Sequence, residues 1–131
     1  MCIRDRVAAG ALRELHEEAG VAAKSLLLRG TISWSNFGPK REEWLGFIFL
    51  AEGWEGDLLS SNDEGSLVWV ELDRLLQACA LDAKTRAEAD LPMWEGDRHF
   101  LPLVFDGDER QFHGSMPYDG DRPLDWNYQR I

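Results

Sequence analysis

Three glutamates near the N-terminus, Glu14, Glu17 and Glu18, have the residue type and the spacing to bind a hard metal cation. On a helix, positions i, i+3 and i+4 lie on one face, so the three carboxylates would emerge together. Mg²⁺ prefers oxygen ligands and uses a few carboxylates together with waters and substrate phosphates. A solvated helix face, with Arg13 and Glu17 as an i,i+4 ion pair, is the alternative, and composition does not separate the two interpretations.

The residues around these glutamates predict the helix that must carry them. Apolar side chains recur at spacings of four, three and four, which is one stripe of a 3.6-residue period, at Ala8, Leu12, Leu15 and Ala19. Ala, Leu, Arg and Glu favour helix, and Gly20 favours the left-handed conformation that commonly ends one. We therefore expect a helix over residues 7–19, with the carboxylates nearly opposite its apolar stripe.

The order of residues 13–21 is more informative than their composition. Arg-Glu-Leu-x-Glu-Glu-x-Gly-Val meets every fixed position in the second half of the Nudix box, R-E-U-x-E-E-x-G-U, in which U is a bulky aliphatic residue. The chain therefore resembles the Nudix hydrolases, which hydrolyse a nucleoside diphosphate linked to another moiety. The resemblance implies that Glu14, Glu17 and Glu18 ligate Mg²⁺, with Mn²⁺ as an alternative ion, and that one of them assists as a base or orients the water. It also implies that Arg13 holds the carboxylates in place without touching substrate.

The first half of the box is met differently. The family places a Glu eight residues before the Arg, which here is Asp5, and a Gly six residues earlier still, which would precede Met1. Residues 1–6 have no clear periodicity. We therefore expect a non-native leader at 1–6, a single Nudix domain over 7–131 that is incomplete at its N-terminus, and missing first strands.

The second half of the chain resembles one branch of the family. Met93-Trp-Glu-Gly-Asp97, Pro102 and Phe112-His-Gly114 resemble the oxidised purine nucleoside triphosphatases, the 8-oxo-dGTP diphosphatases. In that branch a Trp stacks on the base and two acids read its edge, which implies these roles for Trp94 and Asp97. Gly96 replaces the first acid, so the sequence leaves the base preference open.

Three further residues are candidates by the same resemblance. Another acid ligand often comes from a loop before a later strand, which implies Glu64 as a metal ligand. Asp63 beside it is an alternative ligand, and a plain turn role for Glu64 is a second alternative. Trp34 and Trp44 fall on strands that line the pocket in that branch, although ordinary core packing is the role that such strands favour.

Charge and cysteine content restrict the partners. A formal net charge of −10 argues against a nucleic-acid polymer, because phosphate backbones attract Lys and Arg. A nucleotide stays compatible, because a bound divalent metal inverts the local field. Cys2 and Cys79 predict neither a disulfide framework nor a zinc site. No apolar run approaches the ~18 residues that span a bilayer and no secretory signal is visible, so we expect no membrane partner, a cytoplasmic location, and a monomer or homodimer.

The remaining pattern predicts strands mixed with helices. Strands are expected at 26–35 after a connection at 22–25, at 43–51 with both faces buried, and at 66–71. Helical stretches are expected at 72–79 and 94–105, separated by a loop or short helix at 80–92, and residues 111–117 and 124–130 read as a closing hairpin. This order indicates an α+β fold, and the Nudix resemblance implies a mixed sheet held between helices.

The resemblance implies a Mg²⁺-dependent hydrolase that cleaves nucleoside triphosphates to a monophosphate and pyrophosphate. Oxidised purine nucleotides such as 8-oxo-dGTP are the expected substrates, and sanitation of the nucleotide pool is the expected role. A Nudix hydrolase for another substrate, such as a different triphosphate or a capped RNA end, and a catalytically silent fragment are the alternatives. No G-x-S-x-G, P-loop or Cys/His pair supports another catalytic class.

Overall fold

The first helix begins and ends where its apolar period predicts. The computed structural model describes residues 6–131, and α1 covers Val7–Ala19, which confirms the predicted helix. Gly20 ends it at φ 79° and ψ 5°, a left-handed conformation that costs glycine little because it has no Cβ. Its N–H donates to the carbonyl oxygen of His16 at 2.9 Å. The expected leader residues 1–5, Asp5 and Cys2 among them, lie outside the described residues.

The two long strands extend further than predicted. β1 covers Ala22–Phe37 and β2 covers Glu42–Glu55, so the connection expected at 22–25 is wrong. The expectation that the second strand is buried on both faces is also wrong. No residue of β2 is buried, and the Trp44 and Leu45 side chains are 55% and 62% exposed. The reason is topological: β2 lies at the end of the strand order, next to β1 alone, and an apolar run does not reveal whether a strand is central or at an edge.

Shorter elements complete the chain. A small hairpin of β3 (Ser61–Asn62) and β4 (Gly65–Ser66) replaces the strand expected at 66–71, because pairing ends at Ser66. The helices that follow are α2 (Leu72–Ala78), α3 (Ala83–Ala89) and α4 (Asp97–Phe105). The last strands are β5 (Phe112–Gly120), β6 (Arg122–Pro123) and β7 (Asn127–Arg130). Antiparallel pairing of β5 with β7 confirms the closing hairpin.

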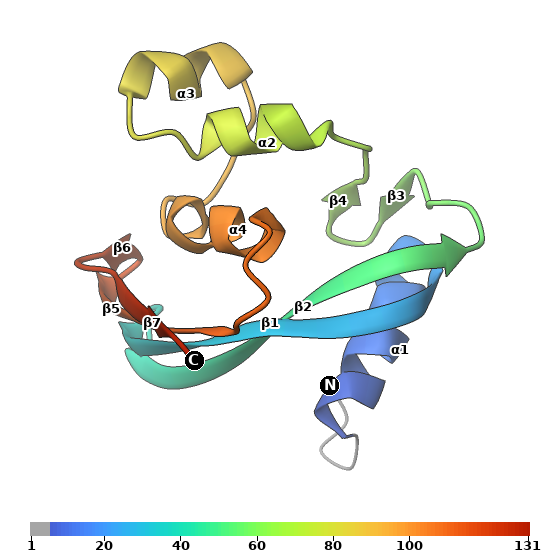
Figure 1. The fold of residues 1–131 in the computed structure, drawn as a ribbon, viewed down its shortest axis with the longest axis horizontal. Coiled ribbons are helices and arrows are strands. Elements are labelled where there is room, and N and C mark those ends of the chain that lie inside the picture. The colour runs from blue at the N-terminus through green and yellow to red at the C-terminus, as the bar shows by residue number, and fades with distance from the viewer. Residues whose placement is uncertain (1–5) are drawn as a thin grey trace. The chain divides into compact units, whose positions relative to one another are not determined.

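The main sheet mixes parallel and antiparallel strands. Its order is β2-β1-β5-β6, and β7 pairs with β5 as well (Figure 1). β1 runs parallel to β5, in register from Gly30 opposite Phe112 to Trp34 opposite Met116, whereas β6 and β7 are antiparallel to β5. A mixed sheet with four helices confirms the α+β class.

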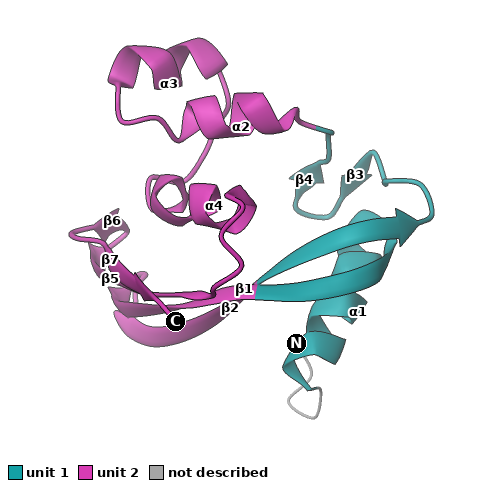
Figure 2. Cartoon of the chain, viewed as in Figure 1, with its two compact units in different colours: residues 1–28, 49–69 teal, residues 29–48, 70–131 magenta. Residues whose placement is uncertain are grey.

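The chain divides into two compact units (Figure 2). The first comprises residues 1–28 and 49–69, which include α1, the β3–β4 hairpin, the start of β1 and the end of β2. The second comprises residues 29–48 and 70–131, with the rest of the sheet and α2 to α4. Three large side chains of the second unit are fully buried, Ile32 on β1 and Phe112 and Met116 on β5. This core supports the elements that carry the tryptophan candidates Trp34 and Trp94.

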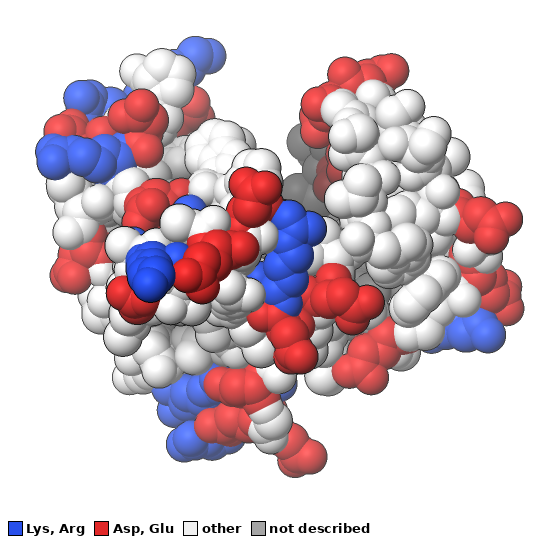
Figure 3. All heavy atoms as spheres, turned by 90° about the horizontal axis from the view of Figure 1, so that it is seen from above, with Lys and Arg blue, Asp and Glu red and all other residues white. Residues whose placement is uncertain are grey.

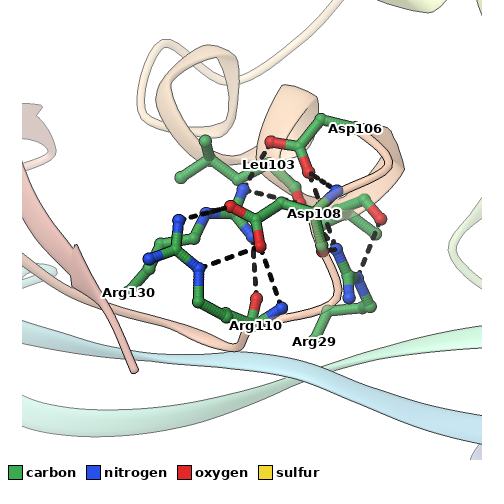
Figure 4. Close-up of polar contacts among 7 residues, drawn as sticks. Arg29, Leu103, Asp106, Asp108, Arg110 and Arg130 are labelled. Carbon is green, nitrogen blue, oxygen red and sulfur yellow. Dashed lines mark hydrogen bonds and ion pairs between the residues drawn. The ribbon is translucent and has the colours of Figure 1, made fainter.

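A network of arginines and aspartates fixes the C-terminal end of α4 (Figure 4). Arg29 on β1 is buried, and its Nε donates to the carbonyl oxygen of Val104 at 3.0 Å. Its Nη2 donates to the carbonyl oxygens of Leu103 at 3.3 Å and Asp108 at 2.6 Å. Arg130 on β7 forms ion pairs with Asp106 and Asp108. Because the last carbonyls of a helix lack partners within it, these donors attach α4 to the sheet.

The surface carries both charges. Figure 3 shows Asp and Glu spread over much of one face, with Lys and Arg among them and no single continuous basic area in that view of the described residues. This distribution agrees with the formal net charge of −10. Among residues 6–131, no helix combines the length and the apolar character needed to cross a bilayer.

Candidate functional site

The C-terminal end of α1 is tied to the β3–β4 hairpin within the first unit. The N–H of Leu59 donates to the carbonyl oxygen of Ala19 at 2.9 Å, and the side-chain Nδ2 of Asn62 donates to the carbonyl oxygen of Glu18 at 3.0 Å. Two of the orphan carbonyls at the helix end are satisfied in this way. The Asn62 Oδ1 accepts from the N–H groups of Glu64 at 2.8 Å and Gly65 at 3.1 Å, which closes the hairpin turn.

These contacts place two of the predicted metal ligands on one cavity. Glu18 and Glu64 both line a cavity of about 290 Å³, together with Leu15, Ala19, Asn62 and residues 65–67. Both glutamates are exposed and therefore accessible from solvent. Asp63, the alternative ligand, is not among the lining residues.

The other two glutamates of the motif, Glu14 and Glu17, lie on the same helix, one turn and one residue before Glu18 respectively. Arg13 Nη1 pairs with Glu17 Oε2 at 2.9 Å, which is the i,i+4 ion pair that the solvated-face alternative predicts, and Glu14 is half-buried. Within residues 6–131, no group of three or more His, Cys, Asp or Glu side chains is gathered closely enough to hold an ion.

The residue types nevertheless suit Mg²⁺, because two residues that carry carboxylates line one cavity. The residues that would hold the ion are Glu14, Glu17, Glu18 and Glu64. Of these, Glu18 and Glu64 already line the cavity, and Glu17 would have to exchange its Arg13 partner for the metal.

A second cavity, within the second unit, brings the predicted base-binding residues together. It has a volume of about 200 Å³ and is lined by Trp34, Phe37, Trp44, Trp94, Asp97 and Tyr118. Trp34 and Trp44 come from neighbouring strands, whereas Trp94 precedes α4 and Asp97 begins it. The indoles of Trp94 and Trp44 are 68% and 55% exposed. Core packing is therefore the wrong role for Trp44, and the two rings leave apolar surface open to a flat ligand.

Burial adjusts the acidity of the polar groups in this cavity. The pKa of Asp97 is raised above its ordinary value by loss of solvation. The pKa of the Tyr118 hydroxyl is raised as well, first by burial and then by the charges of Asp97 and Glu95. Tyr118 therefore keeps its proton at neutral pH and is available as a hydrogen-bond donor.

Three residues of these cavities were not predicted from the sequence. Asn62 links Glu18 to Glu64, and Phe37 and Tyr118 line the second cavity with their rings 4.9 Å apart at an interplanar angle of 82°. Nothing in the sequence pattern pointed to Tyr118, because its contact with Gly96 exists only in the folded chain. The free thiol of Cys79 lies apart from both linings, with its pKa raised by burial.

Comparison with known proteins identifies the family of the chain. A model of the NUDIX domain matches residues 4–103. The uncharacterized Nudix hydrolase YvcI of Bacillus subtilis (strain 168) is 27% identical over 118 residues, which are 88% of this chain and 63% of YvcI, so the chain spans less than two thirds of that relative. The crystal structure of the Mutator MutT protein from Bacillus halodurans matches with a TM-score of 0.77 and 27% identity, covering 98% of this chain and 77% of that one. The matched family model covers most of the chain, and the chain therefore belongs to the Nudix domain family.

Proposed function

We propose that this chain acts as a Mg²⁺-dependent nucleoside triphosphate pyrophosphohydrolase whose favoured substrates are oxidised purine nucleotides such as 8-oxo-dGTP. The observation that carries the proposal is the position of Glu18. It belongs to the Arg-Glu-x-x-Glu-Glu-x-Gly order of residues 13–20, and it lines the same cavity as Glu64.

The carboxylates would bind the ion and position the attacking water. A bound Mg²⁺ would neutralise the negative charge of the phosphates, which is the main requirement of phosphoryl transfer. Glu18 and Glu64 present oxygens at the cavity, and a carboxylate not taken by the ion can accept a proton from the water. Arg13 pairs with Glu17 at 2.9 Å and would hold the Glu17 carboxylate in place until the metal ion takes the position of the guanidinium.

The aromatic cavity would bind the base. The exposed indole of Trp94 offers a face for stacking, and Asp97 offers a carboxylate for the N–H groups of a purine edge. Stacking on Trp94 favours a purine over a pyrimidine, because the larger purine ring system covers more of the exposed indole. The Asp97 carboxylate favours a base that presents N–H groups on its edge.

The test is pyrophosphate release from 8-oxo-dGTP, dGTP and dCTP, with Mg²⁺, with Mn²⁺ and with a chelator. We expect Mg²⁺-dependent turnover with the highest kcat/KM for 8-oxo-dGTP, and loss of turnover on chelation. Turnover that is unaffected by the chelator would contradict the metal assignment.

Gly96 supports a second candidate, a Nudix hydrolase with another substrate, because one acid of the branch pattern is absent. Equal or faster hydrolysis of a different nucleoside triphosphate in the same assay, or release of the cap nucleotide from a capped RNA end, would favour this candidate. A folded protein that turns over none of these substrates would contradict both.

A further inference from the structure

The backbone at Gly96 has no room for a side chain. Gly96 is buried, and a Cβ atom built on it would lie 2.3 Å from the Tyr118 hydroxyl oxygen and 2.8 Å from the Met116 sulfur. Real Cβ atoms do not approach other atoms this closely. The Tyr118 hydroxyl therefore occupies the place where the side chain of residue 96 would start.

The position of the Tyr118 side chain is fixed by its neighbours. Tyr118 is 4% exposed, and its ring meets that of Phe37 edge to face at 4.9 Å. Its backbone carbonyl oxygen accepts from Nδ2 of Asn36 at 3.1 Å. A phenol held this rigidly, lining the same cavity as Trp94 and Asp97, loses little entropy when it forms a hydrogen bond to a ligand.

We propose that Tyr118 determines base specificity by donating its hydroxyl hydrogen to the base edge, beside Asp97 as the acceptor. The inference rests on the proposed function, because it concerns the base-binding cavity. An ionised carboxylate only accepts hydrogen bonds, whereas a phenol also donates one. The pair thus offers one donor and one acceptor where two carboxylates would offer acceptors alone.

The base edge that fits this pair is that of guanine. Guanine presents the O6 acceptor and, on the same edge, N–H donors that include the 2-amino group. Tyr118 would donate to O6 while Asp97 accepts from the N–H groups. 2-Aminopurine keeps the 2-amino group but lacks both O6 and the hydrogen on N1, so the contribution of the Tyr118 hydroxyl is isolated by the difference that Tyr118→Phe makes to the binding of each base.

The first test measures binding without turnover. Calorimetric titration of dGMP and of the 2-aminopurine deoxyribonucleoside monophosphate would be compared in the unaltered chain and in Tyr118→Phe, with Tyr128→Phe on the exposed strand β7 as the matched control. We expect Tyr118→Phe to weaken dGMP binding about 5–10-fold, which corresponds to the net free energy of one hydrogen bond in a partly buried site. The same substitution should change 2-aminopurine binding less than about twofold.

Equal weakening for both nucleotides, no weakening for either, or no binding of dGMP to the unaltered chain would overturn the inference. Because these readouts do not require catalysis, a chain that binds dGMP selectively and hydrolyses nothing would contradict the proposed function and leave the role of Tyr118 standing.

The second test examines the packing between positions 96 and 118. Gly96→Ala should lower the thermal unfolding temperature, and adding Tyr118→Phe should restore part of the loss, because the oxygen 2.3 Å from the new Cβ is removed and the ring carbon lies at 3.4 Å. Additive effects of the two substitutions would overturn the claim that the hydroxyl fills the site of the missing side chain.

Discussion

The side-chain amide of Asn62 donates to the backbone carbonyl oxygen of Glu18 at 3.0 Å, and so holds the β3–β4 hairpin on the last turn of α1. The same side chain accepts from the N–H of Glu64 at 2.8 Å. One neutral residue thus holds the backbone of two glutamates that line a common cavity. This makes Asn62 a positioning residue for the proposed metal site, although it would not itself bind the ion.

Asn62→Ala should therefore impair the site more than the fold. The substitution removes the side-chain hydrogen bond to α1 and the two that close the hairpin turn, and loss of such supporting contacts typically costs 10–100-fold in metal affinity or activity. We expect kcat/KM to fall by about this factor, and the concentration of Mg²⁺ needed for half-maximal activity to rise. The matched control is Asp63→Ala in the same turn, which should change activity less than about twofold. An Asp63→Ala variant that is as impaired as Asn62→Ala would contradict Glu64 as the ligand.

Asp97→Asn should stabilise the protein at neutral pH. Burial raises the pKa of Asp97, so the native state favours the protonated form, and the stability from this group is present at acid pH and lost as the pH rises through its folded pKa. The unfolding temperature of Asp97→Asn minus that of the unaltered chain should therefore be larger at pH 7 than at pH 3. A difference in unfolding temperature that is independent of pH would show that burial of the ionised Asp97 carboxylate does not destabilise the folded state.

Asp108 should have the opposite pH dependence. Hydrogen bonds and the charge of Arg110, with Arg130 nearby, hold the pKa of Asp108 far below its usual range. Its contribution is present above the ordinary Asp value of about 3.9 and is lost as the pH falls towards the folded pKa. Asp108→Asn should lower the urea midpoint at pH 7, and the deficit should shrink at pH 2.5. An undiminished deficit at pH 2.5 would argue that the substitution acts through something other than the carboxylate charge.

Arg29→Met should destabilise the second unit. The buried guanidinium donates to three backbone carbonyl oxygens, and its loss leaves Val104 and its neighbours at the end of α4 without these partners. We expect a loss of about 3 kcal/mol, measured by urea denaturation. Arg122→Met, which removes an exposed pair with Asp119 at 3.3 Å, should cost less than about 1 kcal/mol. Similar losses in the two variants would contradict the anchoring role of Arg29.

Local pattern was sufficient for part of the fold. The helix at Val7–Ala19 follows from the apolar period and a glycine stop, both of which act within a few residues. The exposure of β2 could not be predicted, because an apolar run at Glu43–Ala51 looks alike in a central and an edge strand, and the strand order depends on contacts far apart in sequence.

The candidate site divides in the same way. Trp94 and Asp97 were predicted because they lie close together in a recognisable order. Tyr118 could not be predicted, because its hydroxyl meets the backbone of Gly96 only when β5 packs against the start of α4. Asn62 was missed for a similar reason, since a turn asparagine gives no sign in sequence that it also reaches the carbonyl of Glu18.

The central claim is that Glu18 takes part in hydrolysis at the end of α1, and the most direct measurement is pyrophosphate release from 8-oxo-dGTP by Glu18→Gln. The substitution keeps the size of an exposed side chain, so the unfolding temperature should stay within about 2 °C. We expect kcat to fall at least about 100-fold, as when a group that stabilises transition-state charge is removed. Glu88→Gln on α3, also exposed, is the control and should retain full activity. Activity of a folded Glu18→Gln protein equal to that of the unaltered chain would contradict the account.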